Sequence, residues 1–161
     1  MGSNFSYLKE FCLKRREPSQ IERNAFYPIY ENEIQENEKR LGFRFPSELR
    51  NFFLEIGCGF LPIKHGEKEH CGYSNRILSP MSIADILLEG VDSGQLHPET
   101  EFLEGEMPFF EIGEMASFLI MYPQSDKPNA VYNMLGQIIE ESFSKFIWRL
   151  YYESPIFYLE D

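Results

Sequence analysis

Apolar residues recur along this chain at two spacings, and the spacing changes after about residue 57. The clearest helical pattern covers residues 47–56, opened by Pro46 and Ser47. Within it four apolar residues fall at positions i, i+3, i+4 and i+7, which places them on one helix face. They are Leu49, Phe52, Phe53 and Ile56.

The same spacing predicts four further helices. Gly42 follows directly after one of them and Gly90 is the last residue of another, where a residue in the left-handed conformation commonly ends a helix. Ser82 is expected to cap the third helix, because its side chain can accept a hydrogen bond from the first turn. The four helices are predicted over residues 4–16, 31–41, 82–90 and 141–152.

Beyond residue 57 the pattern changes to short aromatic and β-branched runs, which predict strands. Two pairs of these runs are each separated by a Gly-containing turn, and we expect each pair to form a hairpin. Residues 91–106, which contain two Gly and one Pro, are expected to form a loop. The strands are predicted at 60–63, 77–80, 107–113, 116–123, 130–135 and 137–139.

Helices at both ends with sequential strands between them favour an α+β fold. The length of 161 residues is typical of one domain, and an aromatic content of 16% supplies ample material for a core. We therefore predict an antiparallel or mixed sheet of about four to six strands, packed by N-terminal, mid-chain and C-terminal helices.

The run Gly57-Cys58-Gly59 resembles a phosphate-binding loop at first sight. Phosphate-binding glycines follow a strand and precede a helix, so that backbone N–H groups at the helix start face the anion. Here the order is reversed, because a helix precedes the glycines and a strand follows them. We therefore predict that this run ends one helix and turns the chain into a strand.

The distribution of charge indicates the kind of partner. The net charge is −11, yet the first fifty residues carry nine Lys and Arg against eight Asp and Glu, so the acidic excess lies beyond them. Direct nucleic-acid binding is disfavoured, since it requires a basic surface to neutralise phosphates. An acidic surface suits a basic protein partner, whose approach it accelerates. The alternative is that the acidity serves solubility alone.

Six glutamates lie within sixteen residues that contain no Lys or Arg. One interpretation is a solvated rim, and the other is a surface that binds a cationic partner, with Phe102 and Leu103 as apolar anchors. Nothing in their spacing indicates the separate environments that a catalytic acid and base require. The six partner-binding candidates are Glu99, Glu101, Glu104, Glu106, Glu111 and Glu114.

Catalytic and metal sites find little support in the sequence. Ser74 has no second Gly to form a nucleophile elbow, and His97 has no evident Ser or Cys partner. Four soft ligands lie within fourteen residues, but their spacing does not give the close pairs that structural zinc prefers. They are Cys58, His65, His70 and Cys71. We expect no catalytic residue, cofactor or metal, and we leave metal binding by these four open.

Three cysteines without a CxxC pair favour a reducing compartment over a disulfide framework. No apolar run approaches the roughly 20 residues that span a bilayer, and charged residues interrupt the N-terminal segment where a signal peptide would be apolar. We therefore expect a cytoplasmic protein that does not bind membranes. Its oligomeric state is left open.

The stretch ENEIQENEKRLGFRFPSELRNFFLEIGCGFL resembles the opening signature of the SUKH superfamily, also called the Smi/Knr-type domain. Later segments resemble the following parts of that family in order, at residues 75–80, 107–114, 130–134 and 139–147. Phe45 and Cys58 depart from the usual pattern. The signature positions are Ile34, Glu38, Leu41, Gly42, Pro46, Leu49, Phe52, Leu54, Gly57 and Gly59.

The resemblance implies a SUKH-like domain over residues 29–161, preceded by an N-terminal helical extension over 1–28. It also implies a non-enzymatic binding protein. Many bacterial members are thought to be immunity proteins, often against nuclease toxins, and the expectation is that this chain occludes the basic active-site surface of such a toxin. The alternative is a housekeeping interaction or regulatory module with no toxin partner.

Overall fold

The computed structural model describes residues 4–13, 25–61, 75–92, 95–96, 101–112 and 117–159. Its α-helices are α1 (Glu31–Leu41), α2 (Ser47–Glu55), α3 (Pro80–Glu89) and α4 (Phe143–Tyr152), and its 3-10 helices are η1 (Ser6–Phe11) and η2 (Phe157–Leu159). Its strands are β1 (Phe26–Tyr27), β2 (Cys58–Phe60), β3 (Asn75–Ile77), β4 (Val91–Asp92), β5 (Gln95–Leu96), β6 (Met107–Ile112), β7 (Ser117–Met121), β8 (Val131–Tyr132) and β9 (Ile138–Glu140).

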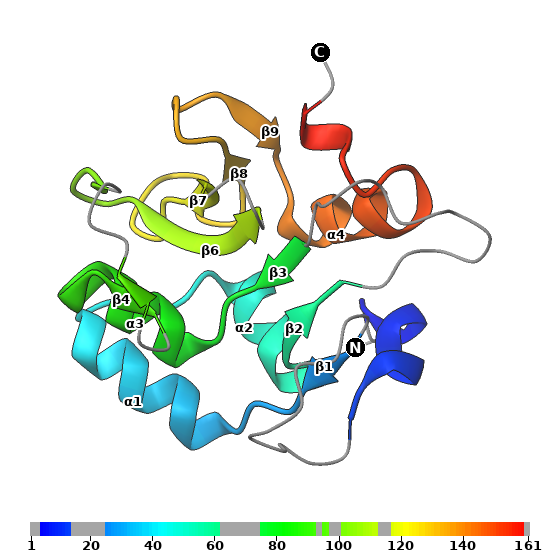
Figure 1. The fold of residues 1–161 in the computed structure, drawn as a ribbon, viewed down its shortest axis with the longest axis horizontal. Coiled ribbons are helices and arrows are strands. Elements are labelled where there is room, and N and C mark those ends of the chain that lie inside the picture. Colours follow the sequence, from blue (N-terminus) through cyan, green and yellow to red (C-terminus); the bar gives the residue numbers. More distant parts are fainter. Residues whose placement is uncertain are drawn as a thin grey trace.

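Seven strands form one antiparallel sheet in the order β1-β2-β3-β6-β7-β8-β9. Figure 1 shows them crossing the molecule from β1 to β9. The α+β class and both predicted hairpins, β6–β7 and β8–β9, are confirmed. The sheet has more strands than the four to six expected, because two-residue strands such as β1 are too short to show a sequence period.

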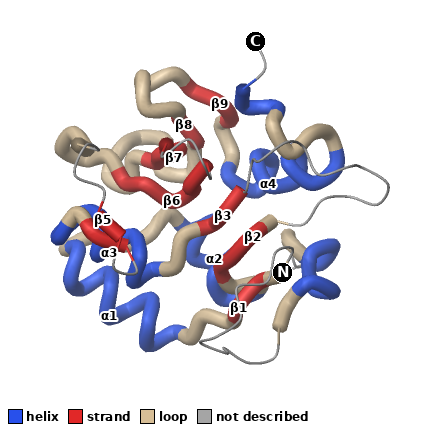
Figure 2. The backbone as a smooth tube through the Cα atoms, viewed as in Figure 1, coloured by secondary structure: helices blue, strands red, loops and turns tan. Residues whose placement is uncertain are grey.

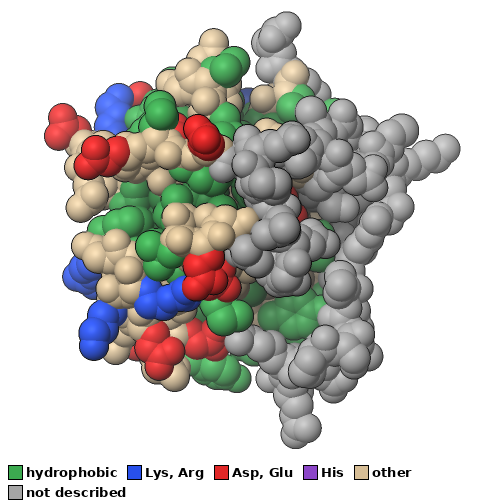
Figure 3. Space-filling model, turned by 60° about the vertical axis from the view of Figure 1, so that its left-hand side comes forward, with side chains coloured by type: hydrophobic (Ala, Val, Ile, Leu, Met, Phe, Trp, Pro, Cys, Tyr) green, Lys and Arg blue, Asp and Glu red, His purple; other side chains and the backbone are tan. Residues whose placement is uncertain are grey.

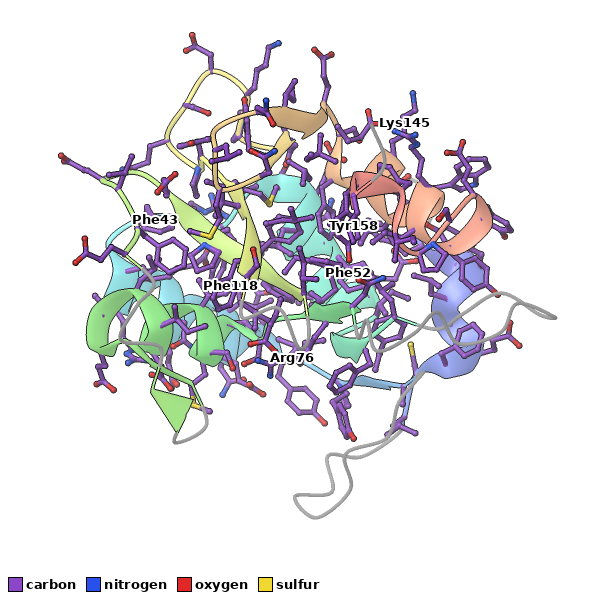
Figure 4. All side chains as sticks on the ribbon, turned by 45° about the horizontal axis from the view of Figure 1, so that its top comes forward. Phe43, Phe52, Arg76, Phe118, Lys145 and Tyr158 are labelled. Carbon is purple, nitrogen blue, oxygen red and sulfur yellow. The ribbon has the colours of Figure 1, made fainter. Side chains whose placement is uncertain are left out.

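Phenylalanine rings fill the space between the sheet and helices α2 and α4. Phe52 of α2 contacts Phe143 of α4 edge to face, with ring centroids 5.6 Å apart. Phe143 also contacts Phe109 of β6 at 5.7 Å, and all three side chains are fully buried. A register shift in β6 between Pro108 and Phe110 accompanies burial of both Phe109 and Phe110. The core therefore lies on this face of the sheet, where Figure 4 labels Phe52.

Helices α1 and α3 contact each other at the opposite end of the molecule from α4, as Figure 2 shows. Helix α1 covers the predicted range, and Gly42 ends it with a left-handed φ of 82°. Helix α3 begins earlier than predicted and Ser79, not Ser82, caps it: the Ser79 hydroxyl accepts a hydrogen bond from the Ser82 N–H. Pro80 explains the shift, since its fixed φ and missing N–H suit the first helical position.

The two glycines around Cys58 are required by the close approach of another backbone. A Cβ on Gly57 would lie 1.9 Å from the carbonyl oxygen of Tyr27, and one on Gly59 would lie 2.4 Å from that of Ala25. Gly59 pairs with Phe26 in β1, and both glycines have positive φ. The prediction that this run leads from a helix into a strand is confirmed, and its glycines serve strand packing.

Several element boundaries differ from the sequence predictions. The first helix is a 3-10 helix that ends at Phe11, and β2 starts at Cys58 rather than at residue 60. Strand β3 spans Asn75–Ile77, whereas the predicted strand spans residues 77–80. Residues 91–106 are not wholly loop, because β4 and β5 pair within them. Strands of two residues are too short to show the apolar alternation that reveals a strand.

The described part of the N-terminal segment packs against the main core. Phe5 and Leu8 are fully buried, and the Phe5 ring lies 5.0 Å from that of Phe52. The backbone N–H of Phe5 also donates to Oε1 of Glu55 at the end of α2. Helix η1 is therefore packed into the domain. The division into an N-terminal extension over residues 1–28 and a SUKH-like domain over 29–161 stays a prediction.

Candidate partner-binding site

The predicted acidic segment enters the described structure at residue 101, between the β4–β5 pair and β6. Glu101 and Glu104 are both exposed there. Glu99 and Glu114 lie outside the described residues, as do Ser74, His65, His70, Cys71 and His97. Among the six candidate glutamates, Glu101 and Glu104 are therefore the described ones that face solvent. Their contact with a partner stays a prediction.

Glu106 points into the protein, where it organises the turn that precedes β6. One carboxylate oxygen accepts a 2.6 Å hydrogen bond from the Leu103 N–H, and the other accepts a 3.2 Å hydrogen bond from the Tyr122 hydroxyl. The Glu106 N–H donates in turn to the Leu103 carbonyl oxygen at 3.0 Å. Burial raises the pKa of Tyr122, and the nearby Glu106 carboxylate raises it further, so the phenol keeps its proton. Glu106 is only 8% exposed, and its role is to hold the turn around Leu103 in place.

Glu111 is neutralised within the sheet. It lies on β6 directly opposite Arg76 of β3, and its carboxylate accepts a hydrogen bond of 3.2 Å from Nε of Arg76. Both side chains are about one-fifth exposed. The pair forms a cross-strand contact between opposite charges, which stabilises a sheet modestly.

Phe102 and Leu103, the two predicted apolar anchors, face different surroundings. The Phe102 ring packs edge to face on Phe118 of β7, with centroids 5.7 Å apart, so it is partly buried. Leu103 is 75% exposed, although its backbone is held by Glu106 at both its N–H and its carbonyl oxygen. The turn also contains Gly105 at a left-handed φ of 87°. A fixed turn therefore presents Leu103 to solvent between Glu101 and Glu104.

Beside this turn lies a groove of about 400 Å³ between the 101–106 turn and the C-terminal half of α3. Its apolar lining comes from three segments that are far apart in sequence, and Glu104 and Gln124 also line it. Figure 3 shows hydrophobic side chains gathered in the middle of this side of the molecule, with acidic side chains above and below them. The apolar lining consists of Leu41, Phe43, Ile86, Leu87, Leu88, Phe102 and Leu103.

Most of this groove leaves no signal in the sequence. The local signal is Leu88, an apolar residue of α3 that lies outside the helical positions of Ile83, Ile86 and Leu87. In the structure its side chain is 53% exposed. Phe43 follows the end of α1, and Figure 4 shows it on the side of the molecule away from Lys145 of α4. The groove depends on the fold bringing Phe43, Leu88 and Leu103 together, which no local pattern reveals.

Other kinds of site find no support in the described residues. No three His, Cys, Asp or Glu side chains among them lie close enough together to hold a metal ion. Of the four candidate ligands only Cys58 is described, and it is partly buried. No helix within the described ranges is both long enough and apolar enough to cross a membrane.

Comparison with known proteins identifies the family. The model of the SMI1 / KNR4 family (SUKH-1) matches residues 28–149. A protein of Bacillus subtilis (strain 168) called immunity protein YxxD is 36% identical over 141 residues, which cover 85% of this chain and 89% of the relative. No solved structure matches the chain. The resemblance seen in the sequence is confirmed, and the chain belongs to the SMI1 / KNR4 family (SUKH-1).

Proposed function

We propose that this chain is a bacterial immunity protein that binds a cognate toxin and neutralises it without catalysing a reaction. The similarity to an immunity protein extends over 85% of the chain, which supports the proposal for the domain as a whole and not for one short motif. The proposal assigns no catalytic residue and no cofactor. It places the protein in the cytoplasm, where it would protect the cell that makes it.

The observation that carries the binding mechanism is the position of two exposed carboxylates around an apolar turn. Glu101 and Glu104 flank Leu103 on a face where the nearest described acid, Glu106, is already used inside the turn. A toxin that acts on nucleic acid must expose basic residues to bind phosphates. An acidic surface of this kind can occupy such a cleft and exclude the substrate, with its net charge of −11 speeding the encounter.

The hydrogen bonds within the turn favour tight binding. Glu106 fixes the Leu103 backbone before any partner arrives, and Phe102 is anchored on Phe118. A segment that is already ordered loses less conformational entropy on binding than a loose loop does. The turn therefore has the rigidity expected of a surface that must hold a toxin with a slow off-rate.

The alternative function is a housekeeping interaction module of the same family with no toxin partner. In that case the acidity would serve solubility and the 101–106 turn would contact no basic cleft. The gene next to the one for this chain discriminates between the two functions, since immunity proteins are commonly encoded beside their toxins. A neighbour without any toxin domain favours the module.

The test of the immunity function is protection. The toxin domain encoded beside this chain is expressed in a bacterial host from an inducible promoter, with this chain, with an unrelated acidic protein of similar size, or alone. We expect growth only with this chain, and a stable complex of the two proteins in size-exclusion chromatography. Toxicity that persists in the presence of the folded chain, or protection by the unrelated acidic protein, contradicts the proposal.

A further inference from the structure

The groove beside the 101–106 turn is unusual because exposed leucines stand on both of its sides. Leu88 is 53% exposed on α3 and Leu103 is 75% exposed on the turn, and both line the groove. Single exposed apolar residues are ordinary on a protein surface, whereas a contiguous apolar patch marks an interaction site. The floor between the leucines is also apolar, formed by Leu87 and Phe102 among others.

We propose that this groove is the socket for one aromatic side chain of the partner, carried on a segment with Lys or Arg on either side of it. This inference rests on the proposed function for the identity of the partner, and it adds the chemistry by which the partner is recognised. Glu101 and Glu104 would meet the basic side chains, and the groove would take the ring.

The size of the groove favours a ring. A buried apolar cavity of about 150 Å³ is large enough to bind benzene. The groove has about 400 Å³ and is open to solvent on the side of Leu103, which leaves room for the ring of Phe, Tyr or Trp with part of its backbone. Binding hot spots are enriched in Trp and Tyr and depleted in Leu. The energetic anchor is therefore assigned to the partner, and Leu88 and Leu103 form the walls.

The charges around the groove select the partner. Glu104 lines the groove and Glu101 lies three residues before it in the sequence, whereas no Lys or Arg is among the described lining residues. Of the basic residues around the end of α1, Arg40 is paired with Asp85 at 2.8 Å, and Arg44, next to the lining residue Phe43, is exposed. A second copy of this chain would bring the same glutamates face to face, and like charges placed opposite each other are unfavourable. Charge complementarity thus points to a basic segment and away from self-association.

The rigidity of the Leu103 wall supports a preformed socket. Its N–H and carbonyl oxygen are both bonded to Glu106, whose other carboxylate oxygen accepts from Tyr122. Tyr122 is held in turn by the Tyr132 ring at 4.8 Å. The wall is thus tied to β7 and β8, so the socket exists before the partner binds.

A peptide titration tests the socket without the toxin. Three acetylated nonapeptides are compared by amide chemical-shift mapping on the whole chain: one with Trp between two Arg residues, one with Ala in place of Trp, and one with Glu in place of each Arg. We expect the first to give saturable shifts at Leu88, Leu103 and Gln124, and the other two to bind about tenfold or more weakly. Shifts of equal size from all three, shifts centred elsewhere, or none, overturn the inference.

Matched leucine variants then test the socket in the complex with the toxin. Leu103→Ala and Leu88→Gln change exposed side chains on its walls, and Leu135→Ala changes a still more exposed leucine (85%) in the β8–β9 turn. We expect the first two to weaken the complex about tenfold or more and the third to leave it unchanged. A toxin complex that is indifferent to all three overturns the socket and leaves the immunity function standing. Peptide binding at the socket without protection from any toxin would support the socket and overturn the immunity function.

Discussion

The phenol of Tyr158 donates a 2.5 Å hydrogen bond to Oδ1 of Asn75, while Nδ2 of Asn75 donates to the Pro155 carbonyl oxygen at 2.6 Å. One asparagine on β3 therefore ties down the segment after α4, at a sequence distance of more than eighty residues. Asn75 is 7% exposed, so its polar atoms have little access to water. The C-terminal segment is thus part of the fold and not an appendage.

Replacing Asn75 with Ala should destabilise the protein, because the Tyr158 hydroxyl and the Pro155 carbonyl would lose their partner in a buried place. The expected loss is about 1–3 kcal/mol in the free energy of unfolding. Urea denaturation measures it, with Tyr30→Phe at a 57% exposed tyrosine as the control for a substitution without a buried hydrogen bond. A loss no larger than that of the control would show that the anchor contributes nothing.

Glu48 caps a helix to which it does not belong. Its Oε1 accepts from the Ser142 hydroxyl at 2.8 Å and from the Ser144 N–H at 2.9 Å, so a side chain of α2 stabilises the N-terminus of α4. Loss of an N-terminal cap costs about 0.5–2 kcal/mol, and we expect Glu48→Ala to fall in that range by thermal or urea unfolding. Glu36→Ala, at an exposed position of α1, is the control. Equal stability of the two variants contradicts this role.

Gly59 should tolerate no side chain, for a reason that Gly136 does not share. Both have positive φ, yet a Cβ on Gly59 would meet the Ala25 carbonyl oxygen at 2.4 Å, while one on Gly136 meets nothing within 4 Å. Gly136→Ala should therefore cost about 1–2 kcal/mol from backbone strain alone, and Gly59→Ala should cost clearly more because β1 must move. Comparable unfolding midpoints for the two variants would show that β1 does not require the glycine.

The ion pair between Glu31 and Arg50 predicts a dependence on pH. A hydrogen bond from Arg50 holds the pKa of the Glu31 carboxylate below its usual value, with a separation of 2.5 Å between Nη2 and Oε1. A carboxylate whose pKa is lower in the folded state stabilises the protein above its unfolded pKa of about 4.3, and this stabilisation is lost as pH falls through the lowered value.

Glu31→Gln should therefore lower the melting temperature at pH 7, and its difference from the unchanged protein should shrink as the pH is lowered toward 3. Melting curves at several pH values measure this, with Glu36→Gln on the same helix as the control for loss of an exposed charge. A difference that stays constant with pH, or that grows in acid, would exclude the ion pair as its cause.

The sequence predicted those elements whose signals are local. Helix α1 matches its predicted range because Ile34 and Leu41 mark its buried side and Gly42 supplies a left-handed end. The β6–β7 hairpin was predictable because both strands are long apolar runs. Strand β1 has no such signal, because two residues show no period. The predicted cap at Ser82 is wrong because Pro80 suits the first helical position and moves the helix start ahead of Ser82.

The site was predicted less completely than the fold. The sequence shows that residues 99–114 are acidic. It does not show which of the glutamate side chains face water and which face the interior. Only the structure separates Glu106, which holds the turn, and Glu111, which pairs with Arg76, from the exposed Glu101 and Glu104. The groove was missed because its lining comes together only through tertiary packing.

The proposed function depends on contact of Glu101 and Glu104 with the basic surface of a toxin. Two double variants test it because they change the net charge equally: Glu101→Lys with Glu104→Lys, and Glu10→Lys with Glu153→Lys. All four residues are exposed, and the second pair lies on η1 and at the end of α4, on the other side of the molecule from the groove (Figure 1). Glu106 is left unchanged, since its substitution would disturb the turn.

The measurement is the affinity of each double variant for the purified toxin domain by titration calorimetry at fixed salt, after unfolding curves have shown that both are folded. We expect the Glu101 and Glu104 reversal to weaken binding at least about a hundredfold, because close opposite charges across an interface contribute several kcal/mol. The control reversal should change it only about a fewfold through the net charge. Equal affinities for the two double variants would contradict the account.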